Sequence, residues 1–444
     1  MTDTMPWAPK WTGFEASRGR FGRVVDGDGI HLILSDGRRM IDGTNTGAPL
    51  GHRHPDIVRA MRNAADNPIV HEGWDWVDRD EAVRDLAEIG FAEEPDWFGG
   101  VRFCLSGSEA NDLALSLAQA ITGRSKLATR ERAYHGAVGL ARDLTVQPQW
   151  HGGLSWSRGG VDAVPRTVSV VELPGPIGER IGPVAPDPER DAQQLAGAEA
   201  ELSDAAAVIL DYTQGAIYAS PGHQDRIATA ARNAGALFIA DEVVTGLGRS
   251  GRWFGFQTGM TRPDIVTLGK GIGAGAAPAA AVVISRELAE RIDGSTWQTA
   301  GTFRGHPIAC AAIRAHLAVL ARDGLVEHVA RLDGVMERLL REVAAAHPSV
   351  QRIDGRGLHW SVELHGSDWR QWRADTTEEP LATRVAVRAA DAGALILTSG
   401  EEGCLFLAPP LISEDQDLER LVAALDHGLE LADEVIGSSS PPPD

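Results

Sequence analysis

The chain has 444 residues, and its 42 Lys+Arg against 62 Asp+Glu give a formal net charge of −20. A hydrophobic share of 43% and a charged share of 23% are ordinary for a soluble globular protein, so the disordered and fibrous classes are excluded. So acidic a balance argues against a nucleic-acid partner or an anionic membrane surface, because both require a basic face.

The N-terminus and the cysteines indicate the compartment. Residues 1–11 have no apolar core of a signal peptide, and no run of about 18 apolar residues occurs anywhere in the chain. Cys104, Cys310 and Cys404 are widely spaced and form no CxxC pattern. We therefore expect a cytosolic protein with reduced cysteines, no membrane span and no metal site.

In chain order, the first sixty residues alternate short β-like runs with turns. A long middle region then alternates helical patterns with short, wholly apolar strands near residues 101–104, 207–210, 237–240, 265–268 and 281–284. Such strands between helices are typical of a mostly parallel sheet that is covered on both faces. The Pro/Gly-rich stretch 147–188 predicts a long surface loop or lid with one strand near 168–171.

The last third of the chain is rich in helical patterns. Helices are predicted over 311–320 and 326–345, then short strands near Leu395 and Leu405, and a last helix over 415–435. The Ser/Pro-rich residues 438–444 predict a disordered tail.

A strand, a glycine turn and a helix start follow each other at residues 103–112. Ser106 and Glu109 have the spacing of a capping box. Free N–H groups at a helix N-terminus bind anions, so this turn is a candidate phosphate site. A well-capped helix without a ligand explains the same residues equally well, and both interpretations stay open.

Two further strand ends carry candidate chemistry. Asp241 and Glu242 follow strand 237–240, at the sheet edge where ligands bind in open α/β folds. An acid there holds a protonated ring nitrogen, or is simply solvated. Lys270, one of only three lysines, follows strand 265–268. A desolvated amine forms a Schiff base with a carbonyl, whereas the alternative is a surface lysine in a glycine loop.

Residues 246–251 match the dinucleotide-binding GxGxxG pattern, with Asp264 downstream. No amphipathic helical pattern follows in 252–256 to receive a pyrophosphate. An NAD-dependent dehydrogenase therefore stays only as a distant alternative.

Taken together, these motifs resemble the class III aminotransferases, which are fold type I enzymes dependent on pyridoxal 5'-phosphate (PLP). The resemblance runs from about Gly22 to Pro410. It is carried by residues 50–55, 106–111, 134–136, 241–246, 270, 301–305 and 408–410. It implies an α/β fold with a large PLP-binding domain (61–307) around a mostly parallel, seven-stranded type of sheet. A smaller α+β domain would come from both chain ends (1–60 and 308–437), before the tail at 438–444.

The resemblance implies two catalytic residues. Lys270 would bind PLP as a Schiff base and then move protons as general acid and base. Asp241 would pair with the pyridinium nitrogen and keep it protonated, so that the ring can act as an electron sink.

It also implies further cofactor-binding residues. Gly107 and Ser108 would bind the phosphate, and Tyr134 would stack on the ring. Thr302 would reach the phosphate from the neighbouring subunit, so the resemblance implies a homodimer with shared active sites.

Three positions depart from the family pattern. Val244 stands where many members have a glutamine that touches the 3-hydroxyl of PLP. Phe406 and Ala216 stand where an arginine and a glutamate form a pair that binds a substrate carboxylate. Because both the arginine and the glutamate are replaced, no charge is left unpaired. The replacement nevertheless puts ordinary amino-group exchange with 2-oxoglutarate in doubt.

Three residues are candidates for substrate contacts besides Phe406. Arg304 is either a replacement anion contact or a structural, phosphate-side arginine. Trp74 and Trp76 fall in a region that lines substrate access in relatives.

The function that we expect is amino-group transfer between an amine or amino acid and a carbonyl acceptor. The alternative is other PLP chemistry on the same fold: aminomutase, β/γ-elimination or replacement, or carbon–carbon bond formation in a biosynthetic pathway.

Overall fold

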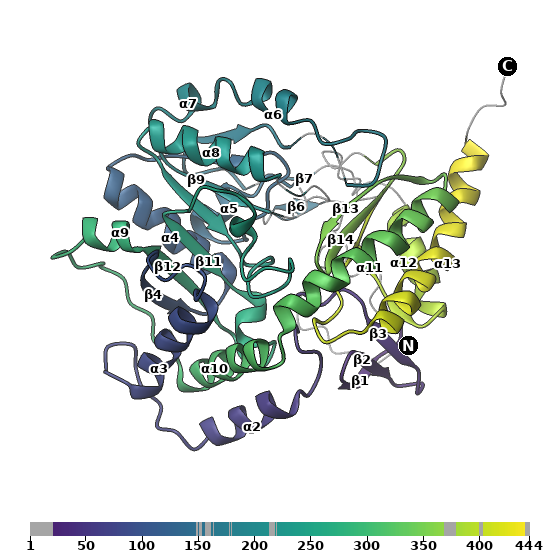
Figure 1. The fold of residues 1–444 in the computed structure, drawn as a ribbon, viewed down its shortest axis with the longest axis horizontal. Coiled ribbons are helices and arrows are strands. Elements are labelled where there is room, and N and C mark those ends of the chain that lie inside the picture. Colours follow the sequence, from purple (N-terminus) through teal and green to yellow (C-terminus); the bar gives the residue numbers. More distant parts are fainter. Residues whose placement is uncertain are drawn as a thin grey trace.

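The computed structural model describes residues 21–147, 150, 153–155, 161–162, 164–176, 178, 180–212, 218, 220–367, 379–398 and 403–439. A large α/β layer lies beside a smaller α+β part that contains the N-terminal strands β1–β3 (residues 24–42) and the C-terminal helix α13 (Asp415–Ser439) (Figure 1). Among the residues that the structure describes, no helix has both the length and the apolar composition that membrane crossing requires.

A seven-stranded sheet, ordered β4-β12-β11-β10-β9-β5-β8, forms the centre of the large part. β12 is antiparallel to both its neighbours, and all other neighbouring strands are parallel. The predicted α/β fold with a mostly parallel sheet is confirmed. The strands are β4 (Phe98–Cys104), β5 (Lys126–Arg130), β8 (Val170–Leu173), β9 (Ala205–Asp211), β10 (Leu237–Asp241), β11 (Ile265–Leu268) and β12 (Ala280–Ser285).

Alternate residues of the central strands pack into two separate apolar clusters. In β10, Leu237 and Ile239 pack with the leucines of α4, whereas Phe238 and Ala240 pack with Ile227 of α8 on the other face. Burial on both faces explains why these strands are apolar throughout. The helices of this layer are α3 (Val77–Asp85), α4 (Gly107–Thr122), α5 (Gly139–Asp143), α6 (Pro188–Gln194), α7 (Ala198–Glu201), α8 (Pro221–Asn233) and α9 (Arg286–Arg291).

The sequence pattern missed β5. Lys126 begins this strand, and its amine donates to Glu201 O at 2.7 Å and Asp204 Oδ1 at 2.6 Å. Thr129 and Arg130 of β5 are buried although they are polar, because their side chains form hydrogen bonds with other buried residues. Contacts with distant parts of the chain stabilise this strand, and the local hydrophobic pattern of the sequence does not reveal such contacts.

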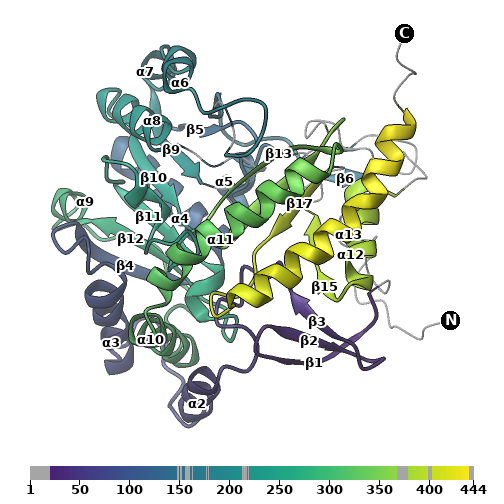
Figure 2. The same ribbon diagram turned by 45° about the vertical axis from the view of Figure 1, so that its right-hand side comes forward.

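Two four-stranded sheets build the smaller part (Figure 2). In the first, β15 from the C-terminal region pairs in parallel with β3 from the N-terminal region, so the two chain ends meet in one sheet. The second, β13-β14-β17-β16, is antiparallel. The strands are β1 (Val24–Asp28), β2 (His31–Leu34), β3 (Arg39–Asp42), β13 (Val350–Arg356), β14 (His359–Leu364), β15 (Ala394–Leu395), β16 (Leu397–Thr398) and β17 (Cys404–Leu407).

Long helices cover these sheets and connect them to the large part. The last one, α13, reaches Ser439 and so extends past the predicted end at 435 into the expected tail, whose residues 440–444 lie outside the described residues. These helices are α2 (Pro55–Ala64), α10 (Pro307–Arg322), α11 (Leu325–Ala346), α12 (Leu381–Asp391) and α13 (Asp415–Ser439). The remaining short elements are β6 (Leu154–Ser155), β7 (Val161–Asp162), η1 (Leu86–Gly90), η4 (Gly255–Thr258) and η5 (Lys270–Gly273).

The glycine-rich residues 246–251 form consecutive turns after β10. The short 3-10 helices η4 and η5 follow them in the described residues, and the next α-helix, α9, begins at Arg286 after two further strands. A dinucleotide pyrophosphate needs a helix N-terminus directly after the glycines. The expected lack of such a helix is confirmed.

Candidate active site

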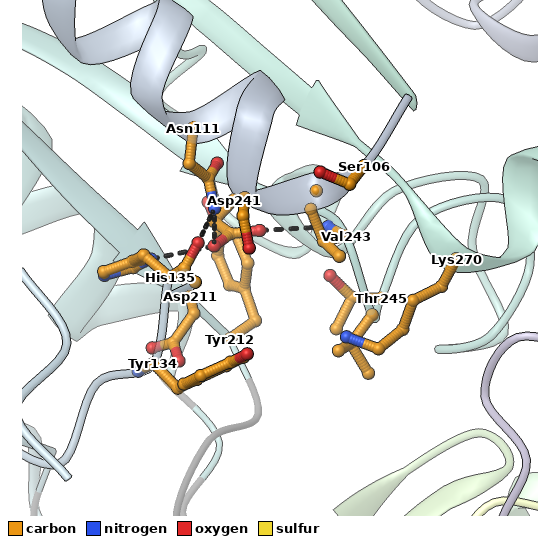
Figure 3. A pocket seen from close by; sticks show the side chains of 14 residues that line it. Ser106, Asn111, Tyr134, His135, Asp211, Tyr212, Asp241, Val243, Thr245 and Lys270 are labelled. Carbon is orange, nitrogen blue, oxygen red and sulfur yellow. Dashed lines mark hydrogen bonds and ion pairs between the residues drawn. The ribbon is translucent and has the colours of Figure 1, made fainter. Parts of the chain in front are cut away.

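A cavity lies where the carboxyl ends of β9 and β10 meet the start of α4 (Figure 3). It brings together five of the predicted residues, which come from four separate stretches of the chain: Gly107, Ser108, Tyr134, Asp241 and Lys270. The other lining residues are Ser106, Asn111, His135, Gly136, Asp211, Tyr212, Val243, Val244 and Thr245.

The first turn of α4 forms one wall of the cavity. Ser106 caps the helix by accepting a hydrogen bond from Glu109 N at 3.2 Å, and the Glu109 carboxylate accepts from Leu105 N at 2.9 Å. The predicted helix start is confirmed. A Cβ on Gly107 would lie 2.7 Å from Val243 Cγ1, so only glycine allows this close approach. With 16 residues of aligned peptide dipoles behind it, this end attracts an anion.

Asp241 lies at the end of β10 and is 5% exposed. Its Oδ2 accepts from Asn111 Nδ2 at 2.7 Å and lies 2.8 Å from His135 Nδ1. Its Oδ1 accepts from Val243 N at 3.1 Å. These contacts fix the carboxylate at the cavity wall, where it can pair with a cationic ring nitrogen.

Lys270 begins η5 with a backbone φ of +41°, which is unusual for a residue with a side chain. Strain of this kind persists where the surrounding structure imposes it, and it is concentrated at functional sites. Solvent still reaches the Lys270 side chain at the mouth of the cavity. Surrounding protein atoms nevertheless desolvate the amine and lower its pKa, and the charges of Asp241 and Asp211 oppose this shift in part. A lowered pKa favours the neutral, nucleophilic amine.

Tyr134 lines the cavity, and its ring meets Trp150 edge-on at 6.0 Å between centroids. Burial, assisted by the charge of Asp241, raises the pKa of its phenol, so the side chain stays neutral. Its backbone N donates to Asp211 Oδ2 at 3.3 Å. The other carboxylate oxygen of Asp211 accepts from Arg130 Nε at 2.8 Å, which neutralises this second acid.

Five of the predicted residues do not line this cavity: Thr302, Trp74, Trp76, Arg304 and Phe406. Thr302 is exposed in a turn next to Phe303, whose side chain is 57% exposed. Trp74 is 71% exposed, and Trp76 is half-buried. Arg79 joins these regions by donating to Trp74 O at 2.8 Å and to Gly305 O at 3.3 Å. The segments of Trp74 and Thr302 therefore lie side by side on one surface.

Arg304 is buried and already paired. Its Nε donates to Glu109 Oε1 at 2.8 Å, and its Nη1 donates to Thr299 Oγ1 at 2.9 Å. A guanidinium held in this way supports Glu109 in the first turn of α4. The contacts favour the structural alternative for Arg304 over a substrate contact.

Phe406 lies on β17, outside the cavity lining. Its ring stacks on the His359 imidazole at 6.1 Å between centroids. Burial, together with the positive charges of Arg249 and Lys270, lowers the pKa of His359 to about 3. Ala216, the other departure, lies outside the described residues.

Sequence reasoning named no role for Asn111, His135 or Asp211. Asn111 follows Gly107 by one helical turn, which directs its side chain at the same strand ends. Asp211 is the register partner of Asp241 on β9. Two neighbouring parallel strands that both end in aspartate were visible in the sequence, and that pattern predicts a shared edge.

Comparisons with known proteins agree with this geometry. The profile described as "Aminotransferase class-III" matches residues 16–429. The "Alanine--glyoxylate aminotransferase 2 homolog 2, mitochondrial" of Arabidopsis thaliana is 29% identical over 91% of this chain and 82% of its own length. The "Ethanolamine-phosphate phospho-lyase homolog 1" of Caenorhabditis elegans is 28% identical over 90% and 87%. A crystal structure of an S-selective transaminase from Arthrobacter sp. superposes with a TM-score of 0.85 at 26% identity, over 93% of this chain and 94% of that one.

Proposed function

The chain belongs to the class III aminotransferase family, and from this membership we propose that Lys270 is the residue through which it transfers an amino group between an amine or amino acid and a carbonyl acceptor. Enzymes of this family depend on PLP. One observation carries the proposal: a single cavity holds a lysine amine, a fixed carboxylate and a helix N-terminus.

The donor set of the cavity fits PLP in its three charged or reactive groups. The start of α4 at Gly107 and Ser108 suits a phosphate, because its backbone N–H groups and a hydroxyl converge there. Asp241 suits a protonated ring nitrogen. The amine of Lys270 suits the aldehyde carbon, and Tyr134 offers an aromatic face.

When bound, PLP supplies an aldehyde that links to amino groups and a ring that accepts the electron pair released at the substrate carbon. Lys270 would hold the cofactor through its amine, and the same amine would move a proton at the substrate carbon. Asp241 keeps a proton on the ring nitrogen, which strengthens the electron acceptor. Tyr134 covers the ring and excludes water.

The homodimer is part of the proposal. Thr302 is exposed and outside the cavity of its own chain, next to the exposed Phe303 and Trp74. An exposed apolar patch of this kind marks a protein interface. A second copy of the chain, docked on this surface, would cover the patch and bring Thr302 to the partner's phosphate site.

A second candidate function is elimination on the same cofactor. The phospho-lyase homolog among the relatives favours it, and so does the changed pattern at Val244 and Phe406. Both reactions need the same lysine and the same acid. They differ in whether the nitrogen of the donor remains on the cofactor, which can be measured by quantifying pyridoxamine phosphate after adding amino donors. Failure with every donor would refute transamination.

The central test is covalent attachment. The purified protein should show the visible absorption of lysine-bound PLP, and borohydride should remove it and leave the cofactor fixed on the peptide that contains Lys270. Lys270→Ala should lose this attachment. Lys126→Ala is the matched control, because that lysine lies at the start of β5 and away from the cavity. Attachment that survives in Lys270→Ala would overturn the proposal.

A further inference from the structure

Two chains of hydrogen bonds end on the same oxygen of Asp241. In the first, Thr129 Oγ1 lies 2.8 Å from His135 Nε2, and His135 Nδ1 lies 2.8 Å from Asp241 Oδ2. In the second, Thr267 donates to Asn111 Oδ1 at 2.5 Å, and Asn111 Nδ2 donates to Asp241 Oδ2 at 2.7 Å. All five residues are at most 5% exposed, so water does not replace these contacts.

Elementary hydrogen-bond chemistry fixes the direction of each contact. An ionised carboxylate can only accept, so His135 must carry its proton on Nδ1 and Asn111 must present its NH₂ group to Asp241. In the neutral ring with its proton on Nδ1, Nε2 is bare and accepts from the Thr129 hydroxyl. The Thr267 hydroxyl donates to the amide oxygen of Asn111. The two hydroxyls therefore support one tautomer and one amide orientation, those that suit an ionised Asp241.

The position of these residues follows from the sheet. Thr267 is the register partner of Asp241 on β11, and Thr129 lies on β5, beyond β9. A carboxylate offers about four acceptor positions. Asn111 and His135 occupy two on Oδ2, and Val243 N occupies one on Oδ1. One position remains, on Oδ1 of a residue that lines the cavity.

We propose that Thr129 and Thr267 are positioning residues, which act through His135 and Asn111 to hold Asp241 ionised and directed at the ring nitrogen of PLP. This inference rests on the proposed function, because it assumes PLP in the cavity. Neither threonine lines that cavity. Removing either hydroxyl leaves a buried nitrogen or oxygen without a partner, which releases the imidazole or the amide to turn away from Asp241.

The test uses Thr129→Val and Thr267→Val, which preserve side-chain shape and remove only the hydroxyl. Each holoenzyme is loaded with PLP that carries an isotope label in the ring nitrogen, and NMR reports the protonation of that nitrogen against pH. We expect wild type to keep the nitrogen protonated through neutral pH. In each variant the proton should be lost at lower pH, with PLP binding weakened roughly tenfold. Thr383→Val, a buried threonine of α12, is the matched control.

A second pair of variants tests the intermediate residue without relying on the valines. In His135→Asn an amide nitrogen takes the place of Nδ1 and still donates to Asp241, whereas His135→Leu donates nothing. The asparagine variant should resemble wild type in the NMR titration, and the leucine variant should lose ring protonation. Loaded variants that melt earlier but titrate like wild type would overturn the inference and show a merely structural role. Wild type that binds no PLP would refute the proposed function instead.

Discussion

The edge of the seven-stranded sheet and the inner face of the small sheet β13-β14-β17-β16 border the same region with different chemistry. At the edge, parallel strands end side by side in Asp211, Asp241 and Thr267, which are register partners. We define the inner face of the small sheet as the side that carries His359, Ser361, Glu363 and Phe406. Successive residues of a strand alternate between faces, so Trp360, Val362 and Leu364 enter the core on the opposite side.

The two regions differ in how their polar groups are held. Asp241 is held by an amide, an imidazole and a backbone N–H, and in the described part of the chain no arginine or lysine forms an ion pair with it. Glu363 on the inner face is held by two arginines, Arg132 and Arg352. The charge of Asp241 at the edge is therefore available for a ligand. The charge of Glu363 on the inner face is neutralised by its two arginines. We therefore propose that cofactor chemistry takes place at the edge and that the inner face supplies structure and shape.

The largest expected effect comes from a substitution at the edge of the seven-stranded sheet. Asp241→Asn removes the charge and keeps the shape, and kcat should fall by roughly 10²–10³ because a preorganised electrostatic contact is lost. The measurement is single-turnover kinetics with a working amino donor. Asp211→Asn is the control: its carboxylate is paired with Arg130, so the loss should appear in stability more than in kcat. Equal losses of kcat would show that the two acids share one role.

The inner face should respond to Glu363→Gln in stability alone. The change leaves two arginines without their shared buried partner, and the free energy of unfolding should fall by about 3 kcal/mol. Chemical denaturation measures this, and the PLP absorption of the native holoenzyme should not change. Glu342→Gln, which breaks an exposed pair with Arg338, should cost almost nothing. A changed PLP spectrum in Glu363→Gln would assign chemistry to the inner face.

A glycine beside the edge gives a smaller and more local effect. Gly136 has a φ of +138°, and a Cβ there would lie 2.4 Å from Ser108 Oγ, in the proposed phosphate site. Gly136→Ala should therefore weaken PLP binding about tenfold, as measured by fluorescence titration of the apoenzyme. Gly123, at the end of α4, has a φ of +70° and open space around its Cβ. Gly123→Ala should lower stability slightly and leave PLP binding unchanged, so equal losses of affinity would contradict the assignment.

The smallest expected effect lies farthest from the edge and depends on pH. His347 contacts Asp433 at 2.7 Å and Asp426 at 3.0 Å, and these two acids raise its pKa although burial opposes the shift. The folded state therefore binds the imidazole proton more tightly than the unfolded state. The resulting stability is complete below the unfolded pKa of about 6.5 and is lost as pH rises through the higher folded pKa.

Because both acids are partly exposed, this contribution should be about 1 kcal/mol. Melting temperatures of wild type and His347→Gln should differ most at acidic pH and converge as pH rises above neutrality. A constant difference at all pH values would mean that the ion pairs are not its source.

The same contrast explains what the sequence could predict. The wholly apolar strands and the glycine turn at 106–108 predicted the large sheet and the edge where a ligand binds. Burial of a strand and capping of a helix each require a recognisable local pattern of residues. β5 was missed, since its polar residues Thr129 and Arg130 are buried only through partners elsewhere in the chain. The inner face was missed too. Its pairing of His359 with Phe406 depends on two strands meeting across a loop, which no local period records.

The parallel pairing of β15 with β3 has a consequence for synthesis on the ribosome. Ile41 of β3 cannot pair with Ala394 of β15 until the ribosome has synthesised the chain as far as β15. Until then the N-terminal hairpin exposes a strand edge, which is a template for wrong pairing with other chains. Folding of this sheet is therefore a late, non-local step, and the nascent chain is most prone to aggregation just before it emerges completely.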